Sequence, residues 1–206
     1  MSQKPQDLDT SARLMAAATD VFSEKGFGGA TVKEIADRAG VNISLISYHF
    51  NGKEGLFRAC LEKFGRERLL HAERILTAPE NVEDLKAKLK LWMMEFLQCH
   101  VEEKSVCGIL HRENVIEHKF MWEVFQNTFL KAFEANAKFF EAGKKKGIVK
   151  KEIDPMLMGA IVFGTLIHLG RSQEIQKVWM GVSIESEKYR AQVTEQFVMI
   201  LLNGIT

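Results

Sequence analysis

The spacing of apolar residues predicts helices along nearly the whole chain. In the first predicted helix, residues 11–25, the apolar positions are Leu14, Ala17, Ala18, Val21 and Phe22. This i, i+3, i+4, i+7 spacing places them on one face of a helix. Alternation of apolar and polar residues, which is typical of strands, extends over no useful length. The pattern therefore predicts an all-α fold.

We expect about nine helices and two folded parts. After a stop at Gly26 and a turn at 27–30, helices are predicted at 31–39, 42–50, 53–75, 82–103, 120–146, 154–171 and 185–203, with a short irregular piece at 105–117. Thr31 and Glu34 have the spacing of a capping box, and Gly40 is suited to end the helix that they begin. The expected organisation is a disordered tail at 1–10, a small domain at 11–55 and a larger helical bundle at 56–206.

The second and third predicted helices have the pattern of a helix-turn-helix. This motif needs a small residue where the helices cross and a turn residue that tolerates left-handed geometry. Ala36 and Gly40 meet these needs, and Ile35, Val41 and Ile46 close a small core. The alternative is a three-helix unit with a structural role only. That reading leaves the exposed polar positions beside the motif unexplained.

Residues 12–57 resemble, without a gap, the DNA-binding domain of the tetracycline-repressor (TetR) family. The resemblance rests on Phe22-Ser23-Glu24-Lys25-Gly26-Phe27, on Thr31-Val32, Ile35-Ala36 and Ala39-Gly40-Val41, and on Tyr48-His49-Phe50, Lys53 and Leu56. A weaker similarity lies at residues 143–155, before the last two predicted helices. The resemblance implies an N-terminal three-helix DNA-binding domain joined to a C-terminal bundle for ligand binding and dimerisation.

The resemblance also implies which residues contact DNA. The start of the second helix, the end of the third helix and Lys53 at the start of the long helix would touch the sugar-phosphate backbone, while the third helix enters the major groove. These residues are Thr31, Lys33, Asn42, Ile43, Ser44, Leu45, Ser47, Tyr48, His49 and Lys53. Many family members have lysine, threonine and tyrosine in place of Ile43, Leu45 and Ser47. Because Ile43 and Leu45 cannot hydrogen-bond a base, we expect a more apolar readout, for example of thymine methyl groups.

Composition and charge narrow the class of protein. The 206 residues are 46% hydrophobic and 27% charged, as in soluble globular proteins, and the net charge is only +1. Any DNA-binding charge must therefore be local. The three cysteines form no CxxC pair, which favours reduced thiols in a cytosol. The N-terminus has no signal-peptide pattern, and the longest apolar stretch, 156–169, is too short to span a bilayer. We expect a cytoplasmic protein without a membrane partner.

No pattern in the chain predicts catalysis, a metal or a cofactor. Cys107 and His111 share a helix face, but no second pair with metal-ligand spacing accompanies them. Glu113 and Glu117 also share a face, yet no nucleophile or base is partnered with them. We therefore expect neither an enzyme nor a metalloprotein. An enzyme working in the helical bundle remains the alternative from a different class.

The larger bundle is expected to hold an effector pocket and a dimer interface. The resemblance implies a ligand chamber, and the aromatic and histidine residues predicted to line it are Trp92, Met93, Phe96, His100, His111, Trp122, Phe125, Phe163 and His168. The last two predicted helices carry small residues and an apolar stripe suited to a two-fold interface. The residues predicted there are Gly159, Ala160, Phe163, Gly164, Tyr189, Val193, Phe197 and Ile200.

These observations together predict a DNA-binding transcription regulator. We expect a homodimeric repressor that binds a palindromic operator and leaves it when a small hydrophobic or aromatic effector binds, held by His100, His111 or His168. The long helix 53–75 would transmit the change. The two recognition helices of a dimer must lie about 34–36 Å apart to enter successive major grooves. The alternative is a helical protein-interaction or small-molecule-binding module without sequence-specific DNA binding.

Overall fold

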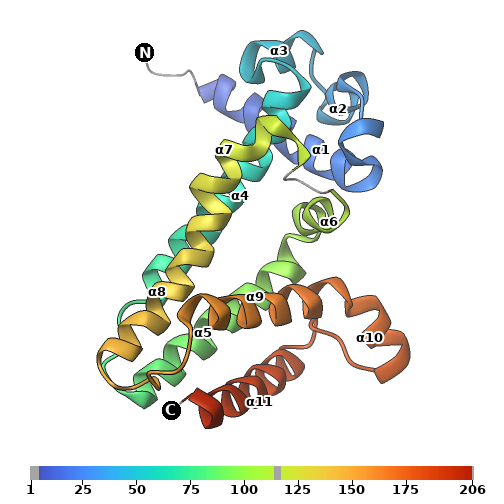
Figure 1. The fold of residues 1–206 in the computed structure, drawn as a ribbon. Coiled ribbons are helices and arrows are strands. Elements are labelled where there is room, and N and C mark those ends of the chain that lie inside the picture. The colour runs from blue at the N-terminus through green and yellow to red at the C-terminus, as the bar shows by residue number, and fades with distance from the viewer. Residues whose placement is uncertain (1–4, 114–116, 206) are drawn as a thin grey trace. The chain divides into compact units, whose positions relative to one another are not determined.

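A computed structural model describes residues 5–113 and 117–205, and every regular element among them is a helix (Figure 1). The elements are α1 (Pro5–Gly29), α2 (Val32–Ala39), α3 (Ser44–Phe50), α4 (Lys53–Ile75), α5 (Val82–Glu102), α6 (Lys104–Arg112), η2 (Lys119–Met121), α7 (Trp122–Phe125), η3 (Gln126–Leu130), α8 (Lys131–Lys145), α9 (Pro155–Arg171), α10 (Gln173–Met180) and α11 (Glu187–Ile205). If η2, α7, η3 and α8, which follow one another without a gap, are counted as one run, these residues form ten helices. The all-α prediction is confirmed.

The first helix begins earlier than the sequence predicts and is interrupted at the predicted Gly26. Helix α1 begins at Pro5, so residues 5–10 are helical where a disordered tail was expected. Proline suits a first helical position because its missing N–H would be unpaired there. Gly26 has φ 72° and ψ 173°, which are not helical, and it separates two helical segments within α1. The first segment therefore ends at the predicted glycine, and a short helical turn follows it up to Gly29.

The chain forms two compact units, whose residues are not contiguous in sequence. The N-terminal unit contains residues 1–66 and 103–127, and the C-terminal unit contains 67–102 and 128–206. Within the N-terminal unit, α1, α2, α3 and the first part of α4 enclose a core. Its fully buried members include Leu14, Phe22, Ile35, Ile46, Leu56 and Phe57.

Residues 103–127 belong to the N-terminal unit, whereas the sequence prediction assigned everything after residue 55 to the larger bundle. Helix α6 replaces most of the predicted irregular piece at 105–117, of which residues 114–116 lie outside the described residues. It packs on α1, where Ser105 Oγ donates to Asp20 Oδ1 at 2.9 Å. The backbone N–H of Phe27 donates to Glu113 Oε1 at 2.8 Å. These long-range contacts, which helical periodicity cannot reveal, shift the boundary.

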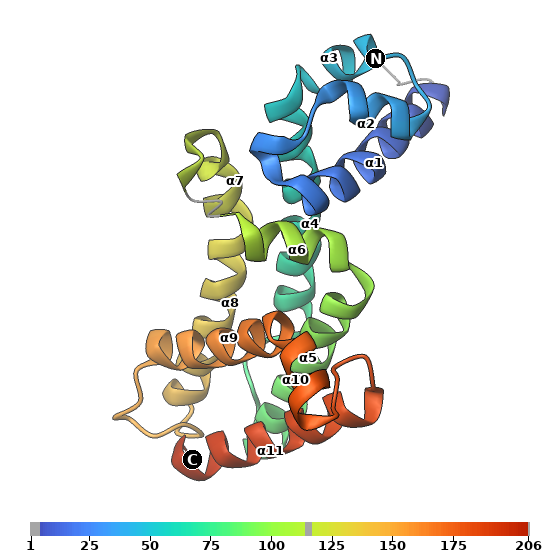
Figure 2. The same ribbon diagram turned by 90° about the vertical axis from the view of Figure 1, so that its right-hand side faces the viewer.

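The C-terminal unit is a bundle built around α5. Helix α9 packs on α8 and α5, and α11 packs on α5 (Figures 1 and 2). Asp154 begins α9 as predicted, because its Oδ1 accepts from the backbone N–H of Met156 at 2.8 Å and of Leu157 at 3.2 Å. Helix α10 was not predicted. No helix in the described part of the chain is long and apolar enough to cross a membrane.

All three cysteines are buried, and none forms a disulfide. Cys60 lies on α4 in the N-terminal unit, Cys107 on α6 of the same unit and Cys99 on α5 of the C-terminal unit. Burial raises the pKa of the Cys60 thiol to about 11. Its thiolate form is therefore scarce at neutral pH.

Candidate DNA-binding surface and ligand pocket

Local sequence signals build the helix-turn-helix. Thr31 Oγ1 accepts from the backbone N–H of Glu34 at 3.2 Å and caps α2, as its spacing predicts. Gly40 ends α2 in the left-handed region, at φ 64° and ψ 40°. Asn42 Oδ1 then accepts from both the backbone N–H of Ser44, at 2.9 Å, and its hydroxyl, at 2.8 Å. This side-chain turn sets the start of the recognition helix α3.

Charged side chains fix α2 against α1. Arg13 Nη2 donates to the carbonyl oxygens of Ala39, at 2.5 Å, and Gly40, at 3.1 Å, where α2 ends. Arg38 makes two hydrogen bonds to the Glu24 carboxylate, at 2.6 and 2.8 Å, and these hold the pKa of Glu24 below its ordinary value. The sequence analysis did not single out these residues, because nothing in local spacing pairs residues 14 or 26 positions apart.

Most of the predicted DNA-contacting residues lie exposed on α2, on α3 or in the turn between them. The exposed ones are Thr31, Lys33, Asn42, Ile43, Ser44, Ser47 and Tyr48, and the half-buried ones are Leu45, His49 and Lys53. Tyr48 is 74% exposed and Ile43 is 46% exposed. Lys33 makes no ion pair within the described chain. These side chains are therefore available to a partner.

Lys53 has a structural role that the sequence analysis missed. Its Nζ donates to the carbonyl oxygens of Phe27, at 2.8 Å, and Ala30, at 3.1 Å, and lies 4.5 Å from the centre of the Phe27 ring. An ammonium group has three N–H donors, so one remains for a phosphate.

His49 is half-buried, and its Nε2 is buried without a hydrogen-bond partner among the described residues.

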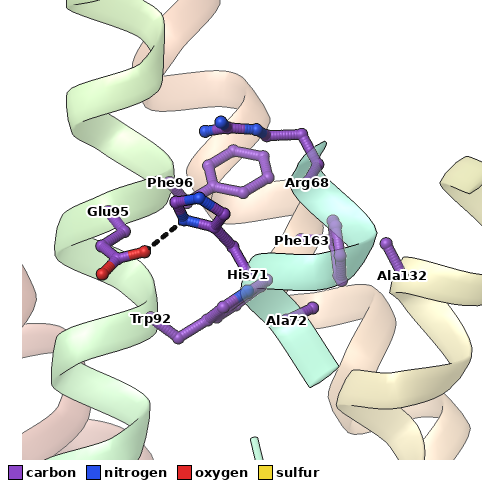
Figure 3. A pocket seen from close by; sticks show the side chains of 8 residues that line it. All are labelled: Arg68, His71, Ala72, Trp92, Glu95, Phe96, Ala132 and Phe163. Carbon is purple, nitrogen blue, oxygen red and sulfur yellow. Dashed lines mark hydrogen bonds and ion pairs between the residues drawn. The ribbon is translucent and has the colours of Figure 1, made fainter. Parts of the chain in front are cut away.

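A small pocket lies within the C-terminal unit. It is lined by Arg68, His71, Ala72, Trp92, Glu95, Phe96, Ala132 and Phe163, from α4, α5, α8 and α9 (Figure 3). Its cavity volume, traced by the centre of a water-sized sphere, is about 20 Å³. That is room for about one water molecule by this measure. A larger ligand must therefore move some of the side chains that line the pocket.

The pocket contains a third of the residues predicted to line it. Trp92, Phe96 and Phe163 are present, whereas Met93 is buried in the core and His168 is exposed on α9. Three others lie in the N-terminal unit, namely His111, Trp122 and Phe125. Five lining residues were missed, namely Arg68, His71, Ala72, Glu95 and Ala132. The i, i+3, i+4 spacing of Arg68, His71 and Ala72 was the available signal.

The charged groups at the pocket form a connected set. His71 Nδ1 lies 2.5 Å from Glu95 Oε2, and Arg74 Nη2 donates to Glu95 Oε1 at 3.2 Å. His100 lies beside this set, with its ring 5.0 Å from that of Phe96 and its Nδ1 3.0 Å from the Phe96 carbonyl oxygen. Burial lowers the pKa of His100; the Phe96 carbonyl opposes that effect, and the positive charge of Arg68 adds to it.

The predicted dimer residues face two directions. Ala160, Gly164 and Ile200 are exposed, whereas Gly159 is buried against Asn136 and Phe133, and Phe163 lines the pocket. The half-buried members of the predicted set are Tyr189, Val193 and Phe197. Other exposed apolar residues, which the sequence analysis did not assign to the interface, are Met156, Leu157, Ile161 and Ile167 on α9, Ile175, Val178, Trp179 and Met180 on α10, and Met199 on α11.

The N-terminal unit thus has the geometry of a helix-turn-helix DNA-binding domain. The family model described as "Bacterial regulatory proteins, tetR family" matches residues 14–60. The resemblance noted in the sequence is confirmed for this part of the chain, which matches the model of TetR-family regulatory proteins.

Proteins similar to this chain in sequence or in fold include other transcription regulators. A probable helix-turn-helix transcriptional regulator of Bacillus subtilis, YttP, is 26% identical over 68% of this chain and 67% of its own. The Mycobacterium tuberculosis repressor Rv3405c is 39% identical over 32% of this chain and 36% of its own. The fold is similar to that of FadR from Bacillus subtilis, solved with stearoyl-CoA. Its TM-score is 0.74 at 17% identity, over 95% of this chain and 99% of that one.

Proposed function

We propose that the protein is a homodimeric repressor that binds a palindromic operator in the cytoplasm and is released by a small hydrophobic effector. The observation that carries this proposal is the set of side chains on α2 and α3 that the fold leaves exposed. Lys33 offers a charge for a phosphate, and Ile43 offers an apolar contact for a base edge. The name of the similar protein Rv3405c, a helix-turn-helix transcriptional repressor, supports the repressor role.

The DNA-binding half of the proposal is tested with DNA from upstream of the protein's own gene. We expect gel shifts at nanomolar to micromolar protein that weaken as salt is raised. Lys33→Ala should weaken binding to every sequence and lower the salt slope by about one unit. Lys138→Ala, which removes the same charge from an exposed position on α8, is the control and should bind as the wild type does. If binding depends neither on the salt concentration nor on the DNA sequence, the result would support the alternative of a helical module without sequence-specific DNA binding.

The homodimer is proposed because exposed apolar residues share one face of α9. Leu157, Ala160, Ile161 and Gly164 follow i, i+3, i+4, i+7 spacing, and Ile200 on α11 is 67% exposed. Such surfaces are normally covered in soluble proteins. Light scattering at micromolar concentration should give twice the chain mass of 23.4 kDa. Ile161→Glu should halve it, whereas Leu91→Glu, an exposed apolar position on α5, should not.

The effector is proposed to bind at the pocket of Figure 3. The aromatic rings there favour an apolar ligand, and the FadR structure holds an acyl chain in a protein of the same fold. Helix α4 begins at Lys53 near the proposed DNA contacts and also provides Arg68 and His71 to the pocket. A ligand that prefers the state unable to bind DNA would shift the population towards it. A compound that binds tightly without changing operator affinity would contradict this coupling.

A further inference from the structure

The pocket in the C-terminal unit has an aromatic side and a charged side. Trp92, Phe96 and Phe163 pack together, with ring centres 5.0 to 5.7 Å apart. Arg68 and His71 of α4 and Glu95 of α5 provide the charged side (Figure 3). We propose that the effector is an organic anion, with a carboxylate bound by Arg68 and His71 and an apolar body held by the aromatic residues. This inference rests on the proposed function, since it specifies the effector of the same site.

The sequence places these groups by two matching helix faces. Arg68, His71 and Ala72 stand at i, i+3 and i+4 of α4, so they point to one side. Trp92, Glu95 and Phe96 have the same spacing on α5. Where these faces meet, each helix brings both charge and apolar surface to the pocket. Helices α8 and α9 add Ala132 and Phe163, which carry no charge.

The partners of the charged lining residues favour an anion over a cationic ligand. Glu95 is the carboxylate among the lining residues, and it is engaged both by His71 and by Arg74, which lies outside the lining. A cationic ligand would therefore find no other carboxylate in the lining, whereas Arg68 and His71 both carry N–H groups that can donate to an anion. The positive charge of Arg68 also acts on the buried His100, since it adds to the lowering of the His100 pKa by burial. A guanidinium group matches a carboxylate with two parallel hydrogen bonds.

The small volume of the pocket is consistent with an exchange of carboxylates. The contact of His71 with Glu95 joins α4 to α5 at the edge of the pocket. An entering carboxylate would take the place of Glu95 on His71 and add a contact to Arg68. Glu95 would keep its hydrogen bonds to Arg74, of which the side chain is 66% exposed. His71 and Glu95 each keep a charged partner in this exchange, so it avoids the cost of an uncompensated buried charge.

The test compares acids with alcohols of the same carbon skeleton. Octanoate and 4-phenylbutanoate are titrated against octanol and 4-phenylbutanol by isothermal calorimetry with the full-length protein. We expect each acid to bind at least about tenfold tighter than its alcohol, as a charged hydrogen bond allows. Arg68→Gln should abolish that ratio. Arg66→Gln is the control, because it removes the same charge from α4 at a residue that is exposed and pairs with Glu62.

Three results overturn the inference: equal binding of acid and alcohol to the wild type, an unchanged ratio in Arg68→Gln, or no binding of either acid. The ratio in the wild type needs no variant, so it stands even if Arg68→Gln fails to fold. The proposed function is judged separately by operator gel shifts. If the acids bind with the expected ratio but leave operator affinity unchanged, the anion site stands and the effector role fails. If another compound releases the operator while the acids do not bind, the reverse holds.

Discussion

Gly55, in the first turn of α4, has no room for a side chain. A Cβ added there would overlap the carbonyl oxygen of Phe50 and lie 2.9 Å from its carbonyl carbon. Phe50 is the last residue of the recognition helix α3. The obstacle is backbone, which cannot rotate away as a flexible side chain can. Gly55→Ala must therefore move the end of α3 or the start of α4 by about 1 Å, since carbon atoms pack at about 3.5–4.0 Å.

The size of the effect follows from two opposing terms. Overpacking costs about 1–3 kcal/mol, and a backbone obstacle places this case at the upper end. Alanine in place of glycine in a helix recovers about 0.5–1 kcal/mol. The net loss is about 2 kcal/mol, which lowers the melting temperature of a chain of this length by about 4–8 °C. Circular dichroism during heating measures it, with Gly28→Ala as the control, because no atom lies within 4 Å of a Cβ added there.

The same substitution should weaken operator binding. Base contacts tolerate little displacement, because hydrogen bonds fail beyond their narrow range of distances. We expect Gly55→Ala to lose at least about tenfold in operator affinity, measured below its melting temperature, equivalent to about one lost base contact. Gly28→Ala should bind as the wild type does. A Gly55→Ala variant with unchanged melting temperature and unchanged operator affinity would refute the reasoning.

Three further predictions follow from single contacts. Thr31→Ala removes the cap of α2 and should cost about 1 kcal/mol in chemical denaturation, while Thr31→Ser should restore most of it. Lys53→Ala should lower the melting temperature and also reduce the salt slope of DNA binding by about one unit; an unchanged melting temperature would contradict its carbonyl contacts. Because burial lowers the pKa of His100, the unfolded state binds its proton first, so stability should fall as pH drops below about 6.5. His100→Gln should flatten that fall, whereas the exposed His168→Gln should not.

The sequence predicted features that depend on neighbouring residues. Thr31 with Glu34 and Gly40 are local signals, and the structure confirms the cap at Thr31 and the helix end at Gly40. Features that depend on distant residues were missed. Glu113 accepts a hydrogen bond from the backbone of Phe27, 86 positions away in the sequence. Contacts of this kind place residues 103–127 in the N-terminal unit, and helical periodicity could not predict them. His71 meets Glu95 across 24 positions, which is why the polar side of the pocket was not predicted.

The burial of all three cysteines has a practical consequence. The thiolate is the form that attacks a thiol reagent, so Cys60, with its raised pKa, and the buried Cys99 and Cys107 should react slowly in the native protein. A cysteine introduced at the exposed Asp37 on α2 would then take a maleimide spin label selectively without removal of the natural ones. In a homodimer, pulsed electron paramagnetic resonance of the two labels would measure the distance between the helix-turn-helix motifs. The natural cysteines can therefore stay in place while the distance between the two helix-turn-helix motifs, on which the proposed switch depends, is measured.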